Sequence, residues 1–452
     1  MQSSEEQALV SAIAAHRAGD GAAAEAGYRR VLAINASNPE ANHNIGVLLA
    51  QAGNTGDALP FFRTAWQANN SRGQFWISYA RALLAEGMAA EAQQLLRKGR
   101  QHGLSGGAVD ALLEQAARSS TSNGPADLLA RGDTALAEGR LAEALDAWRE
   151  ALGVSPDMAG AHLRLGSVLS ESGDVAGGFA HYMRHAAIIH EKLAPRPPDA
   201  PEHRVKHDRE QQAFLAALNP RVAAERFHVA DGARLATTAV NPTNATADLF
   251  AAWHRTRPQM VVIDGFLNPQ ALHKLREYCA QSTIWHRNYD AGYIGATPAD
   301  GFACPLLAQI AEDIMAIYRP ILDGHAFRYL GAFKYDSSLS TGTNTHADNA
   351  AINVNFYIAP DDANLDPDSG GMDVWDVSVP PGEDLDRYNR DEAAMQQFLN
   401  DTGAAMTRIP HRANRAVIFR SDLVHKTSPC RFREGYRNKR INVSFLFGLR
   451  GG

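Results

Sequence analysis

Cysteine is scarce in this sequence. Its 452 residues include three cysteines, Cys279, Cys304 and Cys430, and these are widely spaced. An odd number of distant cysteines indicates neither a disulfide framework nor a zinc knuckle. Reduced, structural thiols are typical of the cytoplasm, so we expect a cytoplasmic protein.

The sequence also lacks a long apolar run, a basic start and an excess of positive charge. No stretch approaches the roughly 18 consecutive apolar residues of a membrane span, and Met1–Glu6 is polar and acidic where a signal peptide requires basic and then apolar residues. The net charge of −6 gives no reason to expect nucleic acid, because phosphate-binding surfaces usually carry a basic excess. Neither a membrane nor nucleic acid is therefore an expected partner.

The composition is that of a globular protein, with 45% hydrophobic and 21% charged residues. The chain is long enough for two or three domains.

In the first half, small residues recur with a period of 34. Gly19, Gly53 and Gly87 are 34 residues apart, and so are Gly139 and Gly173. A small residue stands seven positions before each glycine, and an aromatic residue or leucine nine positions after it: Ala12, Gly46, Ala80, Gly132 and Gly166 before, Tyr28, Phe62, Leu96, Trp148 and Tyr182 after. Such residues allow a tight turn and close packing of two helices.

This pattern resembles the tetratricopeptide repeat. Gly87 and Gly139 are 52 residues apart, or one period plus 18, so we predict three helical hairpins, an irregular joint near 103–125 with a loop or hinge at Ser119–Gly124, and two more hairpins ending near Leu193. Residues 1–193 would then form an all-α solenoid whose concave surface commonly holds a peptide or protein segment. A rigid spacer and a dimerisation surface are alternative roles, and the oligomeric state stays open.

Prolines end the repeat region. Four of them lie between Ala194 and Pro201 and cannot continue a helix. Residues 194–255 are therefore predicted to be a linker and connecting helical segment, in which His203, His207 and Asp208 form solvated surface.

From residue 256 the pattern changes to short extended runs. We predict strands at about 259–266, 326–335, 351–358, 371–377, 415–420 and 440–447, and helices at about 268–280, 305–322 and 390–400. Many short strands with long connections favour a sandwich or a rolled double sheet.

One stretch of this second domain carries candidate metal ligands. His346 and Asp348 are one residue apart, so their side chains point the same way on an extended segment. About two His-x-acid triplets are expected by chance, but the one in Thr345–Asn349 is the only one in the sequence. With His425 from a distant strand, these side chains form the two-histidine, one-carboxylate set that suits non-haem iron(II) and leaves coordination positions open.

Two predicted strands place polar side chains on one face. Asn353, Asn355 and Tyr357 alternate with apolar residues, and Arg440 and Asn442 do the same in the last strand. If both polar faces line one cavity, Arg440 is a cation able to grip a carboxylate in a bidentate pair. The alternatives are the solvent-exposed face of an edge strand and an ordinary surface arginine.

In this order, the residues of the second domain resemble those of the iron(II)/2-oxoglutarate-dependent oxygenases, in style closest to the prolyl-hydroxylase-like branch. The positions that carry the resemblance are Tyr335, His346–Asn349, Tyr357, Ser369–Gly371, Asn414–Phe419, Asp422–His425 and Arg440–Asn442. The resemblance implies a multidomain chain, in which the solenoid is followed by an α+β domain over residues 256–452 with a double-stranded β-helix, or jelly-roll, core.

The resemblance also implies roles for single residues. The metal ligands would be His346, Asp348 and His425, and the contacts of 2-oxoglutarate would be Arg440, Tyr335, Tyr357, Asn355 and Asn442. Fe(II) and O2 would then couple decarboxylation of 2-oxoglutarate to succinate with hydroxylation of a substrate C–H bond. A carboxylate ligand favours hydroxylation, because related halogenases lack it.

Two departures from the family pattern bear on the arginine. Asn442 stands where many members have serine, and Arg440 follows His425 by 15 residues, a longer interval than many relatives show. The second departure leaves Arg437 as a rival anchor for the cosubstrate.

The sequence thus predicts a dioxygenase that hydroxylates a protein or peptide side chain recruited by the repeats. The same chemistry on a small molecule or free amino acid is one alternative. A non-catalytic repeat scaffold with a vestigial metal site is another, and a zinc hydrolase with the same ligands is a third, although no general base is evident.

Overall fold

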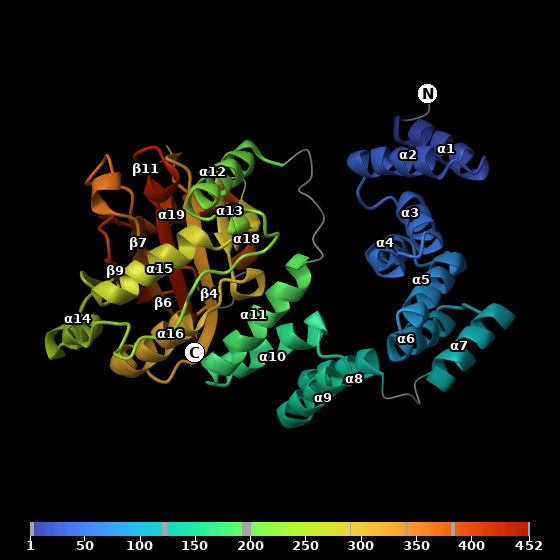
Figure 1. Cartoon of the computed structure of the whole chain (residues 1–452), viewed down its shortest axis with the longest axis horizontal. Coiled ribbons are helices and arrows are strands. Elements are labelled where there is room, and N and C mark those ends of the chain that lie inside the picture. Colours follow the sequence, from blue (N-terminus) through green and yellow to red (C-terminus); the bar gives the residue numbers. More distant parts are fainter. Residues whose placement is uncertain are drawn as a thin grey trace. The chain divides into compact units, whose positions relative to one another are not determined.

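A computed structural model describes residues 4–119, 124–191, 200–289, 291–339, 342–380 and 385–450. The chain forms two compact units, residues 1–161 and 162–452 (Figure 1). The division between them lies within the predicted repeat region and not at the prolines, most of which fall in 192–199, outside the described residues. None of the described helices is long and apolar enough to cross a membrane.

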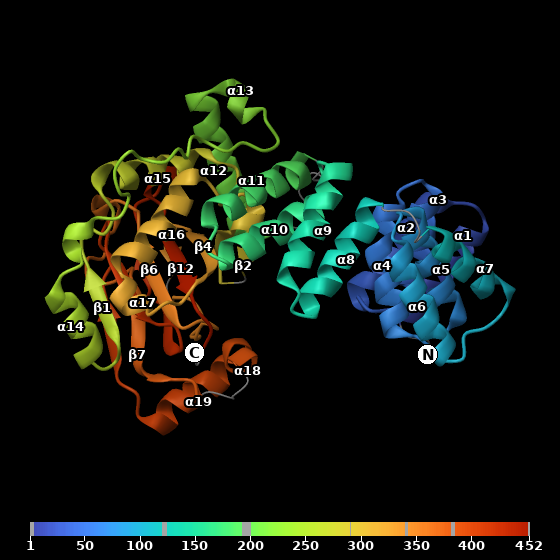
Figure 2. The ribbon, with the colours of Figure 1, turned by 90° about the horizontal axis from the view of Figure 1, so that it is seen from below.

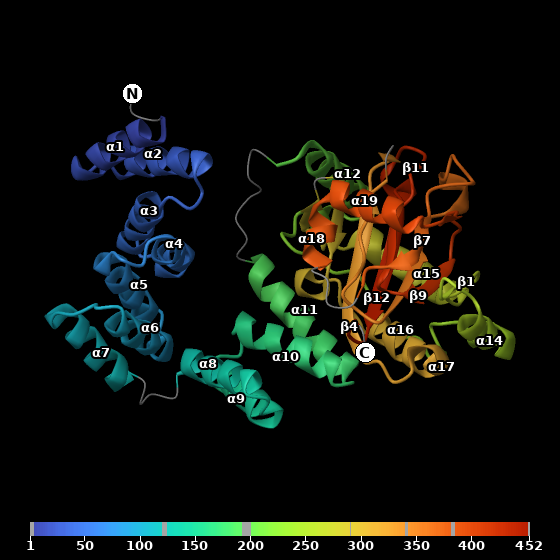
Figure 3. The ribbon, with the colours of Figure 1, turned by 180° about the vertical axis from the view of Figure 1, so that it is seen from behind.

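The first unit is a series of helical hairpins (Figure 3). Its helices are α1 (Ser4–Arg17), α2 (Gly21–Ile34), α3 (Pro39–Gln51), α4 (Thr55–Ala68), α5 (Gly73–Ala85), α6 (Ala89–Gln101), α7 (Gly107–Ser119), α8 (Pro125–Ala137) and α9 (Leu141–Val154). The turn glycines Gly19, Gly53, Gly87 and Gly139 have φ between +76° and +82°, a conformation that glycine adopts without steric cost. The turns therefore lie where the 34-residue period predicts them.

Within a hairpin, the small residue of the first helix packs against the aromatic residue of the second. A Cβ atom built on Gly46 would lie 2.8 Å from the Phe62 ring, and one built on Gly132 would overlap the Trp148 indole. These are the pairs that the sequence columns predict, and glycine is what allows the close approach.

The predicted irregular joint contains a further helix, α7. Val109, Leu112 and Ala116 of α7 pack in one apolar cluster with residues of α5 and α6. The predicted hinge at 119–124 falls mostly on residues 120–123, which lie outside the described residues.

The second unit begins with helices and continues as a helix-covered sheet. Its helices are α10 (Ala159–Glu171, which starts before the division), α11 (Val175–Glu191), α12 (Glu202–Leu218), α13 (Pro220–Ala223), α14 (Ala247–Arg255), α15 (Pro269–Gln281), α16 (Pro305–Ile317), α17 (Arg319–Leu322), α18 (Leu385–Arg390) and α19 (Glu392–Thr402). Val175 and Phe179 of α11 belong to the main core of this unit, where the Phe179 ring lies 5.7 Å from that of Phe327. A helix of the predicted repeats is thus a core element of the second unit.

Helix α12 also packs on this unit. His207 is 3% exposed, and its Nδ1 lies 2.9 Å from Asp208 Oδ1. Buried Gln211 donates to the carbonyl of Ser282 at 3.0 Å. The prediction that His207 and its neighbours form solvated surface is wrong, because α12 buries a hydrogen-bonded polar face that has no apolar signature in the sequence.

Twelve short strands are described. They are β1 (Met260–Ile263), β2 (Arg287–Tyr289), β3 (Tyr293–Ala296), β4 (Phe327–Tyr335), β5 (Ser338–Leu339), β6 (Ile352–Tyr357), β7 (Met372–Ser378), β8 (Met406–Ile409), β9 (Ala416–Arg420), β10 (Leu423–Thr427), β11 (Cys430–Arg431) and β12 (Ile441–Phe447). The major sheet has the order β1-β9-β6-β12-β4-β3-β2, the minor sheet has the order β10-β7-β8, and β11 pairs with β5. Every described pair is antiparallel.

The two faces of the major sheet differ in polarity. Helices α15 and α16 cover one face (Figure 2), where Leu275 and Ile310 share a core with Phe356 and Phe445. On the other face, Ser444 of β12 pairs in register with Asn355 of β6. Apolar residues of the minor sheet pack beside this polar area, against Val417 and Phe419 of β9. The polar area is where the predicted site residues lie.

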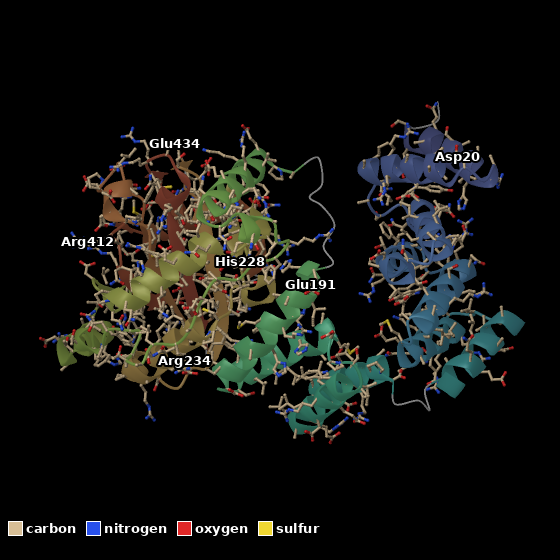
Figure 4. The ribbon with its side chains drawn as sticks, in the orientation of Figure 1. Asp20, Glu191, His228, Arg234, Arg412 and Glu434 are labelled. Atoms are coloured by element: carbon tan, nitrogen blue, oxygen red, sulfur yellow. The ribbon has the colours of Figure 1, made fainter. Side chains whose placement is uncertain are left out.

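An ion-pair cluster fixes the loop before β9. Asp264, which follows β1, accepts from Arg415 Nε at 2.6 Å and from Arg412 Nη1 at 2.9 Å. The Arg415 hydrogen bond lowers the pKa of Asp264. Arg412 lies at the periphery of the unit (Figure 4) and is 59% exposed, so its pair adds little stability.

Candidate metal centre

The sequence segment 342–351, between β5 and β6, carries two of the three candidate ligands. One isolated antiparallel bridge joins its His346 to His425 of β10. His346 N donates to His425 O at 2.9 Å, and His425 N donates to His346 O at 2.8 Å. The bridge brings together two histidines that are far apart in the sequence.

The three candidate ligands converge on one point. One ligand atom from each of His346, Asp348 and His425 lies within 4.8 Å of the other two. Asp348 Oδ2 is 3.5 Å from His425 Nε2, and Asp348 Oδ1 is 3.9 Å from His346 Nε2. The spacing leaves room for one cation between the three side chains.

Neighbouring groups fix which atoms face this point. His346 Nδ1 lies 3.0 Å from the Asn344 carbonyl, and His425 Nδ1 lies 2.9 Å from the Leu423 carbonyl. A ring nitrogen that faces a carbonyl must carry the proton, so each Nε2 presents its lone pair. Asn353 donates to Asp348 Oδ2 at 2.7 Å and orients the carboxylate. The donor set of two imidazoles and one carboxylate therefore fits a divalent transition metal.

Burial keeps His425 in the form that a metal needs. Burial, reinforced by the neighbouring His346 imidazole, lowers the pKa of His425 to about 4. The imidazole is thus neutral at physiological pH.

Arg440 lies deep in the same polar area and is 1% exposed. Its Nε donates to the Gly370 carbonyl at 2.5 Å, its Nη2 to the Gly371 carbonyl at 3.0 Å, and its Nη1 to Asn442 Oδ1 at 2.8 Å. Its guanidinium carbon is 4.4 Å from the centre of the Tyr335 ring and 5.2 Å from that of Tyr357. These contacts fix a planar cation.

The two tyrosines around Arg440 differ in their hydroxyl contacts. The Tyr335 hydroxyl lies 2.9 Å from Thr427 Oγ1. The Tyr357 hydroxyl is buried, and among the described residues it has no hydrogen-bond partner. Burial raises the pKa of Tyr357 to about 12, so the hydroxyl is a protonated donor.

Arg437, the alternative anchor, lies elsewhere. Its side chain is 54% exposed and pairs with Glu277 of α15. Arg440 is therefore the one of the two arginines that reaches the polar area.

These residues border one small cavity of about 90 Å³. It is lined by Tyr293, Tyr329, Phe333, Tyr335, Thr343, His346, Asp348, Asn353, Asn355, Met372, His425, Lys426, Thr427, Arg440, Asn442, Ser444 and Leu446. Every predicted site residue is among them except Tyr357, whose ring packs against Arg440.

The aromatic wall of the cavity was not predicted from the sequence. Tyr293 of β3 stacks on Tyr335, with ring centres 4.8 Å apart and an interplanar angle of 19°. Tyr289 stacks on the other side of Tyr293, with ring centres 4.5 Å apart. Strands β2 and β3 are too short to show alternation. The signal for this wall in the sequence is limited to the three tyrosines, Tyr289, Tyr293 and Tyr335.

Comparison with known proteins gives one family match and several partial structural likenesses. Residues 49–116 match the family model of the tetratricopeptide repeat. No curated protein sequence matches the chain. Similar solved structures include a MamA RS-1 double mutant, with 14% identity and a TM-score of 0.25, covering 42% of this chain and 98% of that one.

Two other similar solved structures each cover less than half of the chain. The TPR2B-domain:pHsp70 complex of yeast Sti1 has 19% identity and a TM-score of 0.24, covering 25% of this chain and 96% of that one. The non-heme alpha-ketoglutarate-dependent carbocyclase SnoK from nogalamycin biosynthesis has 13% identity and a TM-score of 0.36, covering 46% of this chain and 85% of that one. The family match and the strand pairing show a helical, tetratricopeptide-like N-terminal region and a β-rich C-terminal region of antiparallel sheets.

Proposed function

We propose that this protein is an iron(II)- and 2-oxoglutarate-dependent dioxygenase that hydroxylates a side chain of a protein or peptide. The observation that carries the proposal is the convergence of two imidazole Nε2 atoms and a carboxylate beside a cavity that also holds a buried, oriented arginine. In the same proposal, the major and minor sheets form a double-stranded β-helix.

Each residue of the site has a role in this proposal. His346, Asp348 and His425 hold Fe(II), and Asn353 orients Asp348 through its 2.7 Å hydrogen bond. Bound together, the metal, 2-oxoglutarate and O2 supply the oxidising chemistry, with succinate and carbon dioxide as products.

The other end of the cavity holds the cosubstrate. Arg440 binds its distal carboxylate, and Tyr335, Asn355 and Asn442 shape the surrounding wall. The Tyr357 ring packs against the Arg440 guanidinium from outside the lining of the cavity. Stacking on Tyr335 keeps the guanidinium plane fixed and excludes water from one of its faces.

The repeats support a protein or peptide as the substrate. They supply a surface of the type that holds an extended peptide segment.

The test is a turnover assay on the full chain with Fe(II), 2-oxoglutarate and peptides from a cell extract. We expect peptide-stimulated succinate formation and a gain of one oxygen on the modified peptide by mass spectrometry. His346→Ala is expected to abolish both signals. The proposal is overturned if free amino acids or metabolites stimulate succinate formation and no peptide does.

The recruiting role of the repeats is tested separately. A variant that lacks residues 1–158 keeps α10 whole and removes the first unit. We expect its KM for a modified peptide to rise at least tenfold, with kcat largely retained. An unchanged KM would mean that the repeats do not recruit the substrate.

A further inference from the structure

The segment that carries His346 and Asp348 is paired with a strand on one edge alone. His346 exchanges both of its backbone hydrogen bonds with His425. In an extended chain, successive residues direct their N–H and C=O groups to opposite edges. The backbone groups of Thr345 and Ala347 therefore face away from β10, where buried groups would be costly without partners.

Side chains of the α18–α19 insertion, between β7 and β8, bind this second edge. Asn389 Oδ1 accepts from Ala347 N at 3.0 Å, and Asn389 Nδ2 donates to Ala347 O at 2.9 Å. One carboxamide thus reproduces both hydrogen bonds of a neighbouring strand. Glu392 accepts from Thr345 N and from Thr345 Oγ1, both at 2.8 Å.

The side chain between the two ligands is held by the same insertion. Ala347 is fully buried and shares an apolar cluster with Met395 and Leu399 of α19 and with Val424 of β10. Since side chains alternate along an extended segment, burying Ala347 on one face directs His346 and Asp348 to the other. Backbone and side-chain contacts therefore fix the same geometry.

We propose that Asn389 and Glu392 are positioning residues, which set the distance between His346 and Asp348 and thereby the affinity of the metal centre. The proposal rests on the metal-binding part of the proposed function. Neither residue lines the cavity, so both act through the backbone of the ligand segment.

Asn389→Asp is the sharpest test, because it changes one group and keeps the shape of the side chain. The new carboxylate can still accept from Ala347 N, but its other oxygen faces Ala347 O without a proton to donate. Electrostatics alone predicts that a negative charge near a cation site tightens metal binding. Loss of positioning predicts the opposite result, which is weaker metal binding.

The measurement is a Co(II) titration of the metal-free full chain, followed by visible absorption, with thermal unfolding of each variant alongside. We expect Asn389→Asp and Glu392→Ala to weaken Co(II) binding about 10- to 100-fold, the usual range for groups that orient metal ligands. Gln397→Glu is the matched control: it adds a charge on the exposed face of α19, where Gln397 donates to Asp401 Oδ1 at 2.6 Å, and it is expected to leave the Co(II) affinity unchanged.

Two outcomes separate this inference from the proposed function. If the wild-type chain binds Co(II) and Asn389→Asp binds it equally well or more tightly while folded, the positioning role is overturned. If the wild-type chain does not bind Co(II) and behaves like His346→Ala, the metal centre itself is overturned. If the Glu392→Ala chain unfolds at ordinary temperature, Asn389→Asp alone tests the positioning role, because aspartate has the same side-chain shape as asparagine.

Discussion

Arg440 is held by groups that a lysine could not satisfy. Its guanidinium donates to two backbone carbonyls and to Asn442, and it stacks on Tyr335. A lysine ammonium carries the same charge but has neither the planar fork nor the stacking face. A positive charge alone therefore cannot replace the contacts that Arg440 makes at this position.

Arg440→Lys is expected to raise the KM for 2-oxoglutarate about 10- to 100-fold, because hydrogen bonds between charged groups contribute about 1.5–3 kcal/mol. The rate of 2-oxoglutarate consumption against its concentration measures this. Arg437→Lys is the matched control, since Arg437 is exposed and pairs with Glu277, and it should leave KM unchanged. Equal effects of both substitutions would contradict the assignment.

Removal of the Tyr357 hydroxyl is expected to leave the folded protein as stable as before, or more so, and to leave the 2-oxoglutarate affinity unchanged, because Tyr357 does not line the cavity. The hydroxyl has no partner among the described residues, so Tyr357→Phe removes an unpaired buried group. Tyr335→Phe makes the comparison, because it breaks the 2.9 Å contact with Thr427 and should lower stability by about 1 kcal/mol. Denaturant unfolding and 2-oxoglutarate affinity are the two measurements.

The site residues that follow a local pattern could be predicted from the sequence. The spacing of His346 and Asp348 and the alternation around Arg440 can be read directly from neighbours in the chain. Asn389 and Glu392 could not be found in this way. They contact backbone atoms more than forty residues earlier, and a side chain that binds a backbone leaves no periodic signal.

Among the elements, the predicted strands with clear alternation are present as β1, β4, β6, β7, β9 and β12. Strands β2 and β3 were not predicted, because three or four residues are too few to establish a period. Helix α12 was predicted as exposed, because the face that it buries is polar. The sequence therefore predicts elements well when burial is apolar and poorly when buried groups are satisfied by hydrogen bonds.

The helical hairpins depend on glycine at the crossing point of their two helices. Gly132→Ala is expected to destabilise the first unit by about 1–3 kcal/mol, because the new methyl would overlap the Trp148 indole. Gly153→Ala serves as control: a Cβ atom there meets nothing within 4 Å, and alanine in a helix is favoured by about 1 kcal/mol. Urea unfolding followed by circular dichroism measures both, and a stabilising Gly132→Ala would contradict the packing.

The docking of α11 makes stability depend on pH. His190 of α11 stacks on His286, with ring centres 3.9 Å apart, and on Phe227. Burial lowers the pKa of His286 to about 3, reinforced by His190 and Arg204 and opposed by Asp300. A folded pKa below the unfolded value of about 6.5 means that stability is highest above pH 6.5 and falls as the pH drops toward 3.

His286→Phe keeps an aromatic ring in the stack and removes the titration. Between pH 6.5 and 5, we expect the free energy of unfolding of the wild type to fall more steeply than that of the variant, by up to about 1.4 kcal/mol per pH unit. Urea unfolding across this range gives both slopes. Parallel slopes would show that His286 does not titrate in the unfolding transition.

For the whole molecule, the division at residues 161 and 162 determines where the chain can be cut. Removal of residues 1–193 would take away Val175 and Phe179, which are buried in the main core of the second unit. We expect that variant to lose cooperative thermal unfolding, because two large core side chains are worth several kcal/mol. The variant that lacks residues 1–158 should retain a cooperative transition, and equal melting behaviour of the two would contradict the role of α11.

The order of folding events follows from the way the ligand segment is held. Its geometry requires β10 on one edge and the α18–α19 insertion on the other, so contacts between distant parts of the sequence must form before the three ligands face one point. Contacts of this kind form late, because long loops must close first. If the chain binds a metal as proposed, metal uptake is therefore a late event in its maturation, because a partly folded chain lacks the assembled ligand set.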